Sequence, residues 1–93
     1  MSMTEIEVTV AGVVQGVSYR AYAQDSATAL QLTGFVQNKP DGTVLVVAQG
    51  MPEILKEYIE YLHEGSLQAK VATLGVDWKT PKTVYDEFSI LHD

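Results

Sequence analysis

The chain has 93 residues, of which 46% are hydrophobic, a formal charge of -6 and a pI near 4.7. This length supports one compact core, so we expect a single domain over residues 1–93. The acidic balance argues against nucleic acid as a partner, because such binding depends on many lysine and arginine contacts to phosphate. With no cysteine, the chain has no disulfide, thiolate metal site or cysteine nucleophile.

The opening segment MSMTEIEVTV carries acidic side chains and no apolar run of the length that a signal peptide needs. No later segment approaches the roughly 20 apolar residues of a membrane span. We therefore expect a cytoplasmic protein with no membrane partner.

The first part of the chain predicts a strand, a loop and a helix. Apolar and polar residues alternate through EIEVTV, residues 5–10, as in a strand with one buried face. Apolar residues then recur at helical spacing over roughly residues 20–33. We expect Asp25 in an early turn, where it suits the helix dipole, and Gly34 as the residue that ends the helix.

The rest of the chain predicts a hairpin, a second helix and two further strands. FVQNK and VLVVAQ read as strands joined by a tight PDGT turn, in which proline presets φ and glycine takes a positive φ. An apolar stripe opens at Pro52 and closes at Gly65, as in an amphipathic helix. Alternation over 72–78 predicts the next strand, and Phe88 with Ile90 predicts a short fifth segment.

The resulting order is strand, helix, strand, strand, helix, strand. We therefore predict an α+β fold, a ferredoxin-like βαββαβ sandwich in which two helices cover one face of an antiparallel sheet. A right-handed crossover makes the first two strands parallel, with one strand between them. The segment 14–20 and Asn38 then share one edge of the sheet, with backbones about 10 Å apart.

The segment VVQGVSYR, residues 13–20, ends in the only arginine of the chain. A loop that leaves a strand and enters a helix presents backbone N–H groups and the positive end of the helix dipole, which favour an anion. Gly16 lets the backbone approach a ligand closely. Arg20 would close the site with a planar fork that matches two phosphate oxygens. The segment therefore predicts a cradle for a phosphoryl group.

Each of these residues also has an ordinary structural explanation. A glycine in such a loop is more often a turn residue, and an arginine entering a helix is more often at the surface or paired with an acid such as Asp25. Asn38, beside a P-D-G turn, is by itself more often a turn residue. Ser18 lacks any base that would make it a nucleophile, which leaves a cradle hydrogen bond or solvent exposure.

Several chemistries find no support in the sequence. Position 14 holds valine where the similarly spaced loop of cysteine phosphatases has its nucleophile, so water must attack. No nucleotide-binding glycine motif is present. His63 and His92 have no partner at metal-ligand spacing, so we expect neither a metal nor another cofactor.

Two separated segments carry a family resemblance. AGVVQGVSYR and GFVQNKPDGTVLVVAQG resemble the two signature segments of the acylphosphatase family, and the closing FSI at 88–90 also agrees. The resemblance covers nearly the whole chain. It implies an acylphosphatase-like domain that hydrolyses the carboxyl-phosphate bond of acyl phosphates, independently of metal.

The resemblance also implies residue roles and partners. Arg20 would hold the phosphoryl group, and Asn38 would orient the attacking water. The phosphate would be cradled by the backbone amides of Gln15, Gly16, Val17, Ser18, Tyr19 and Arg20. The implied partner is a small acyl phosphate, with inorganic phosphate as product and inhibitor, and the expected state is a monomer.

Three positions depart from the family pattern. Tyr19 stands where phenylalanine is common and adds the possibility of a hydrogen bond. Val13 and Leu45 replace residues that are often charged or polar, which leaves substrate preference open. None of the three removes a supposed catalytic group.

Other functions stay open on sequence alone. A non-catalytic small-ligand or regulatory module on the same fold is the main alternative, although it would not need Arg20 and Asn38 together. An RNA-binding sheet would need aromatic residues on its central strands, where EIEVTV and VLVVAQ have none. A structural interaction protein is a third class.

Overall fold

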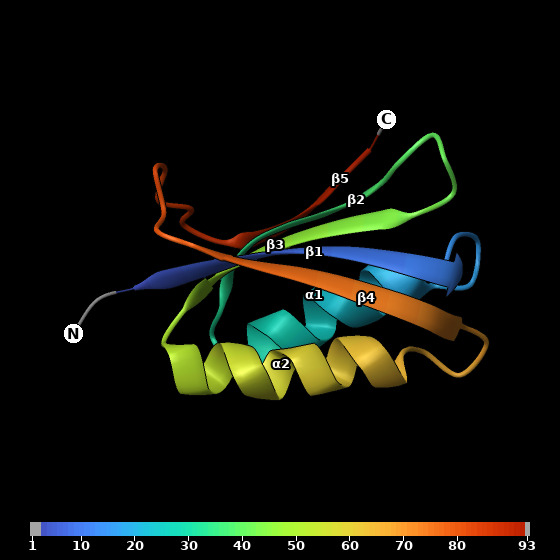
Figure 1. The fold of residues 1–93 in the computed structure, drawn as a ribbon, viewed down its shortest axis with the longest axis horizontal. Helices are drawn as coiled ribbons and strands as arrows, with labels where there is room; N and C mark the ends of the chain where they lie inside the picture. Colours follow the sequence, from blue (N-terminus) through green and yellow to red (C-terminus); the bar gives the residue numbers. More distant parts are fainter. Residues whose placement is uncertain (1–2, 93) are drawn as a thin grey trace.

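Seven helices and strands follow one another in the computed structural model, which describes residues 3–92 (Figure 1). In chain order they are β1 (Thr4–Val13), α1 (Tyr19–Ala29), β2 (Thr33–Asn38), β3 (Val44–Gly50), α2 (Pro52–Glu64), β4 (Lys70–Lys79) and β5 (Phe88–Leu91). The predicted order of elements is therefore confirmed.

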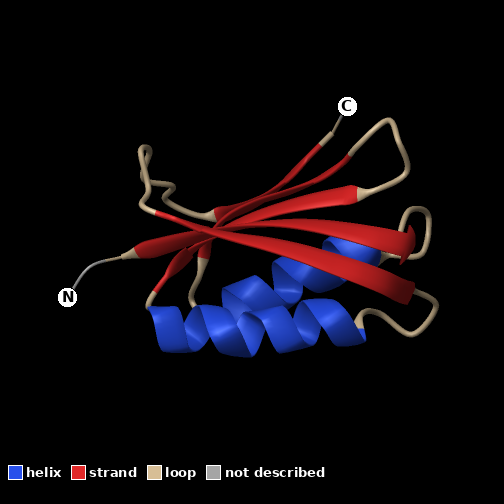
Figure 2. Ribbon diagram, viewed as in Figure 1, coloured by secondary structure: helices blue, strands red, loops and turns tan. Residues whose placement is uncertain are grey.

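The five strands form one sheet in the order β4-β1-β3-β2-β5. Both helices lie on the same face of this sheet (Figure 2), so the predicted ferredoxin-like α+β fold is confirmed. β3 pairs antiparallel with both β1 and β2, which makes β1 and β2 parallel with one strand between them, as predicted. β5 pairs parallel with β2, so the complete sheet is mixed and only its first four strands are antiparallel throughout.

The core lies between the sheet and the two helices. In the register of β1 and β3, Ile6, Val8 and Val10 face the same side as Ala48, Val46 and Val44, and all six side chains are fully buried. The helices add their own buried residues, among them Ala23, Ala27, Leu55, Tyr58 and Leu62. The alternation of the sequence therefore separates a buried face from a polar one. Full burial of a valine or leucine side chain contributes about 1.5–3 kcal/mol.

Helix α1 ends at Ala29, four residues before the predicted limit. The N–H of Leu32 donates to the carbonyl of Ala27 (2.9 Å), and the N–H of Gln31 donates to the carbonyl of Thr28 (3.0 Å). Gln31 has a φ of 60°. These bonds form a Schellman motif in which glutamine takes the left-handed position that glycine usually fills. Gly34 was therefore the wrong residue for the helix end.

Gly34 has a different role, and one other expectation about this region, for Asp25, is also wrong. Gly34 lies inside β2 with a φ of 140°, and a Cβ there would collide with the carbonyl of Val47, so the glycine permits close pairing with β3. Asp25 lies in the middle of α1, because the helix starts at Tyr19, and the first turn contains no acidic residue.

Three connections meet at one end of the sheet, on the right in Figure 1: the β1–α1 loop, the β2–β3 turn and the α2–β4 loop. Gln15 Nε2 donates to the carbonyls of Lys39 (2.8 Å) and Thr43 (2.9 Å). Ser66 Oγ donates to the carbonyl of Val17 (2.9 Å). These bonds fix the β1–α1 loop from both sides. Within residues 3–92, none of the helices has the length and apolar character that crossing a membrane requires.

Candidate active site

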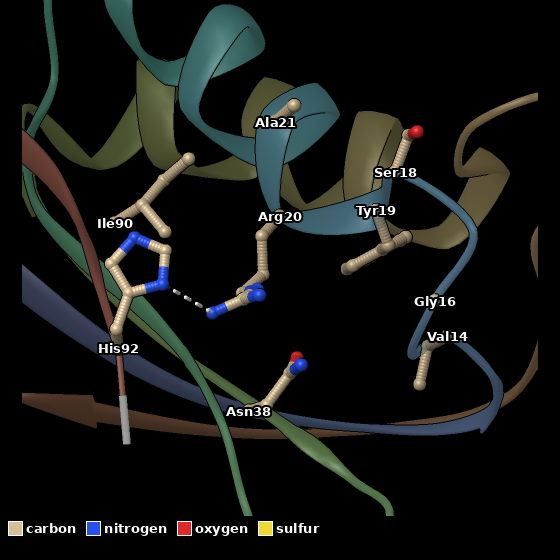
Figure 3. Close-up of a pocket in the computed structure, with 9 residues that line it drawn as sticks. All are labelled: Val14, Gly16, Ser18, Tyr19, Arg20, Ala21, Asn38, Ile90 and His92. Carbon is tan, nitrogen blue, oxygen red and sulfur yellow. Dashed lines mark hydrogen bonds between the residues drawn. The ribbon is translucent and has the colours of Figure 1, made fainter.

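A pocket of about 210 Å³ lies where the start of α1, the end of β2 and the end of β5 meet (Figure 3). Its lining consists of Val14, Gly16, Ser18, Tyr19, Arg20, Ala21, Asn38, Ile90 and His92. The pocket therefore combines residues that are far apart in the sequence.

Arg20 lies in the first turn of α1, and its side chain extends into the pocket above Asn38 (Figure 3). Its Nη1 donates to the carbonyl of Leu91 (3.3 Å) and lies 3.5 Å from Nδ1 of His92. Among residues 3–92, the ion pair present joins Lys79 to Glu7, so the alternative of an Arg20–Asp25 pair does not hold. The guanidinium charge is therefore not neutralised by a carboxylate of the described residues.

Asn38 is the last residue of β2 and the only asparagine of the chain. Its register partner is Val44, which is buried toward the helices, and Figure 3 shows its amide pointing toward the head group of Arg20. The Oδ1 atom is buried and accepts no hydrogen bond from any residue between 3 and 92. A buried polar atom without a partner costs about 1–3 kcal/mol, so this oxygen favours a bound water or ligand in the pocket.

The β1–α1 loop has an unusual backbone. Gly16 and Ser18 have φ values of 73° and 61°. Among the described residues, none accepts a hydrogen bond from a backbone N–H of residues 15–20. Unpaired N–H groups of a loop with left-handed residues, followed by a helix N-terminus, form a favourable environment for an anion.

The side chain of Ser18 points away from Arg20 and Asn38 in Figure 3, and the residue is exposed. Ser18 precedes α1 and makes no side-chain capping bond. Of the two alternatives for this hydroxyl, solvent exposure therefore agrees with the structure. The contribution of Ser18 to the pocket comes from its backbone.

Two of the predicted cradle residues do not line the pocket. Gln15 directs its side chain to the β2–β3 turn, and Val17 offers its carbonyl to Ser66. Gly16, Ser18, Tyr19, Arg20 and Asn38 do line it. The structure thus brings most of the predicted site residues together, with Gln15 and Val17 in the supporting loop.

Tyr19 is fully buried, and its hydroxyl donates to the carbonyl of Leu62 near the end of α2 (2.7 Å). Burial raises the pKa of Tyr19 well above its usual range, with a smaller contribution from nearby Tyr22, so the hydroxyl keeps its proton. The hydrogen bond that phenylalanine would lack at this position is therefore present. It ties the start of α1 to α2.

The sequence did not indicate that Ile90 and His92 would contribute to the pocket. Both arrive there because β5 pairs in parallel with β2, with Ile90 opposite Val36. The FSI segment predicted the strand but not its neighbour in the sheet. As for metals, no cluster of three or more histidine, aspartate or glutamate side chains suited to holding an ion occurs within residues 3–92.

The fold and the pocket together define a small α+β protein with a polar site at one end of a ferredoxin-like sheet. The model of the acylphosphatase family matches residues 6–90. The acylphosphatase of Methanococcoides burtonii is 40% identical over 84 residues, which is 90% of this chain and 88% of the relative. That of Thermus thermophilus is 43% identical over 82% of this chain and 86% of the relative.

A solved structure shows the same relationship. The crystal structure of the acylphosphatase from Bacillus subtilis aligns with a TM-score of 0.92 and 32% identity, over 95% of this chain and 98% of that one. This chain belongs to the acylphosphatase family. As a member of that family it is a hydrolase of acyl phosphates.

Proposed function

We propose that the pocket hydrolyses the carboxyl-phosphate bond of a small acyl phosphate by direct attack of water on phosphorus. In this mechanism, Arg20 and the backbone N–H groups of residues 15–20 hold the phosphoryl group, and Asn38 orients the water. Inorganic phosphate is the product and, because the same groups bind it, an inhibitor. We also propose that the chain acts as one domain and as a monomer in the cytoplasm.

The observation that carries the proposal is the meeting of Arg20 and Asn38 in one pocket, with Asn38 Oδ1 buried and unpaired among residues 3–92. A neutral amide oxygen accepts a hydrogen bond from water without repelling a phosphate, as a carboxylate would. The guanidinium supplies a charge that attracts the phosphoryl oxygens and a fork that fits two of them. Asn38 thus suits the attacking water, and Arg20 suits the phosphoryl group.

Phosphoryl transfer needs positioning and charge stabilisation more than covalent help. The water oxygen forms a bond to phosphorus while the bond from phosphorus to the acyl oxygen breaks. The electron pair of that bond leaves with the carboxylate, and the proton of the attacking water passes to a phosphate oxygen. The N–H groups and Arg20 stabilise the charge on the equatorial oxygens.

The leaving group explains why so few residues suffice. A carboxylate has a conjugate acid with a pKa of about 4, so it departs without a general acid. Among the residues that line the pocket, none is an aspartate, glutamate, lysine or cysteine, and the one histidine, His92, places its Nδ1 3.5 Å from Arg20 Nη1. The proposal therefore assigns no proton donor to the departing oxygen.

Hydrolysis in ¹⁸O-labelled water tests where the water attacks. Attack on phosphorus places the label in inorganic phosphate, whereas attack on the carbonyl carbon places it in the carboxylate. Acetyl phosphate is a suitable substrate, and the two products are separated and weighed by mass spectrometry. We expect one labelled oxygen in the phosphate; label in acetate would contradict the proposal.

A further inference from the structure

His92 lies beside Arg20 in the pocket, directly after β5. Arg20 Nη1 lies 3.3 Å from the carbonyl oxygen of Leu91 and 3.5 Å from His92 Nδ1. In Figure 3 the ring of His92 and the loop at Gly16 lie on opposite sides of the guanidinium. Nη1 is therefore held from the β5 side, while Nε and Nη2 donate to none of the residues from 3 to 92.

The chemistry of the pair assigns a role to each atom. A guanidinium only donates hydrogen bonds and keeps its charge in proteins, so Nδ1 of His92 has to accept. When Nδ1 accepts, the proton of a neutral imidazole lies on Nε2. The carbonyl of Leu91 accepts from the same nitrogen of Arg20. Two acceptors at the end of β5, the carbonyl of Leu91 and Nδ1 of His92, thus orient one end of the fork.

The acceptors at the end of β5 lie beside β2, the strand that ends at Asn38. Leu91 is the register partner of Gln37, the residue before Asn38 in β2. β5 is tied to α1 by a second bond, from Gln24 Nε2 to the carbonyl of Phe88 (3.1 Å). The paired strands β2 and β5 therefore fix the position of Arg20 relative to Asn38.

We propose that His92, with the carbonyl of Leu91, orients the guanidinium of Arg20 and is a positioning residue for acyl phosphate hydrolysis. This inference rests on the proposed function, in which Arg20 holds the phosphoryl group. A long side chain loses rotamer freedom when it binds a ligand, and a side chain that is already held loses less. Removal of the acceptor therefore weakens phosphate binding without removing a group that contacts phosphate.

Two substitutions at one position separate this role from simple packing. His92→Ala removes the acceptor, whereas His92→Asn retains an oxygen at the position of Nδ1. The readouts are KM for acetyl phosphate, the inhibition constant of inorganic phosphate, and Tm. We expect His92→Ala to raise KM and the inhibition constant together by about three- to tenfold, and His92→Asn to stay within about twofold of wild type.

The other histidine of the chain provides a matched control. His63 lies exposed in α2 and does not line the pocket, so His63→Ala should leave both constants unchanged. A separate readout is the ¹⁵N spectrum of the neutral His92 ring, in which we expect the Nε2–H tautomer. This signature does not depend on turnover.

Five outcomes are decisive. Unchanged constants in His92→Ala, a failure of His92→Asn to restore them, or an Nδ1–H tautomer would each overturn the positioning role while leaving hydrolysis intact. A lower Tm with unchanged constants would show a purely structural role. Wild-type protein that neither hydrolyses acetyl phosphate nor binds inorganic phosphate would overturn the proposed function itself.

Discussion

The guanidinium of Arg20 and the amide of Asn38 line one pocket, although Arg20 lies in the first turn of α1 and Asn38 ends β2. They are the only arginine and the only asparagine of the chain. β3 lies between the strands that lead to them, and the parallel direction of β1 and β2 brings both residues to the same end of the sheet. The strand topology thus brings Arg20 and Asn38 into the same pocket.

Arg20 should be essential because it supplies the charge of the proposed phosphate site. We expect Arg20→Ala to lower kcat/KM by roughly 10²–10³-fold or more and to abolish inhibition by inorganic phosphate. Arg20→Lys should also be severely impaired, because an ammonium cannot replace the fork. The measurement is steady-state kinetics on acetyl phosphate, with circular dichroism to verify folding. Near-normal turnover by folded Arg20→Ala would show that the phosphate is held elsewhere.

Asn38 should affect a different constant, because it is proposed to orient water rather than to bind substrate. We expect Asn38→Ala to lower kcat by roughly 100-fold with little change in KM. Asn38→Asp should also be slow and should bind phosphate less well, since it adds a negative charge beside the anion. If Asn38→Ala instead raised KM alone, the residue would be a binding group.

The hydroxyl of Tyr19 should contribute to stability. Tyr19→Phe leaves the carbonyl of Leu62 without this donor in a buried environment, and we expect the free energy of unfolding to fall by about 1–2 kcal/mol. Tyr22→Phe is the matched control, because Tyr22 donates a similar bond to Tyr61 (2.8 Å) at a more exposed position. Urea titration of both variants measures the difference. Equal losses would mean that burial of the Tyr19 bond is unimportant.

The sequence predicted the frame of the fold because its local signals agree with the packing. The alternation through residues 5–10 matches the buried face of β1, and the stripe between Pro52 and Gly65 matches the buried side of α2. The end of α1 was missed because Gln31 adopts a left-handed conformation that glycine favours. Backbone hydrogen bonds stabilise this conformation, and such bonds cannot be predicted from residue type.

The site was predictable to the extent that it follows from loop motifs and strand direction. Arg20 and Asn38 were identified because a crossover rule and two separated segments place them together. His92 was not identified, because its position depends on the parallel pairing of β5 with β2. No local sequence pattern predicts that pairing. Gln15 was expected through its backbone only, while its side chain holds the loop against the β2–β3 turn.

The most direct test of the central claim compares leaving groups. Purified protein is assayed on an acyl phosphate and on a simple alkyl phosphate at equal concentration, with and without EDTA. An alkoxide has a conjugate acid far weaker than a carboxylic acid, and N–H groups around the phosphoryl oxygens do not neutralise charge on the departing oxygen. We predict rapid hydrolysis of the acyl phosphate, survival of the alkyl phosphate and no effect of EDTA. Comparable rates on both substrates, or activity lost to EDTA and restored by added metal, would contradict the account.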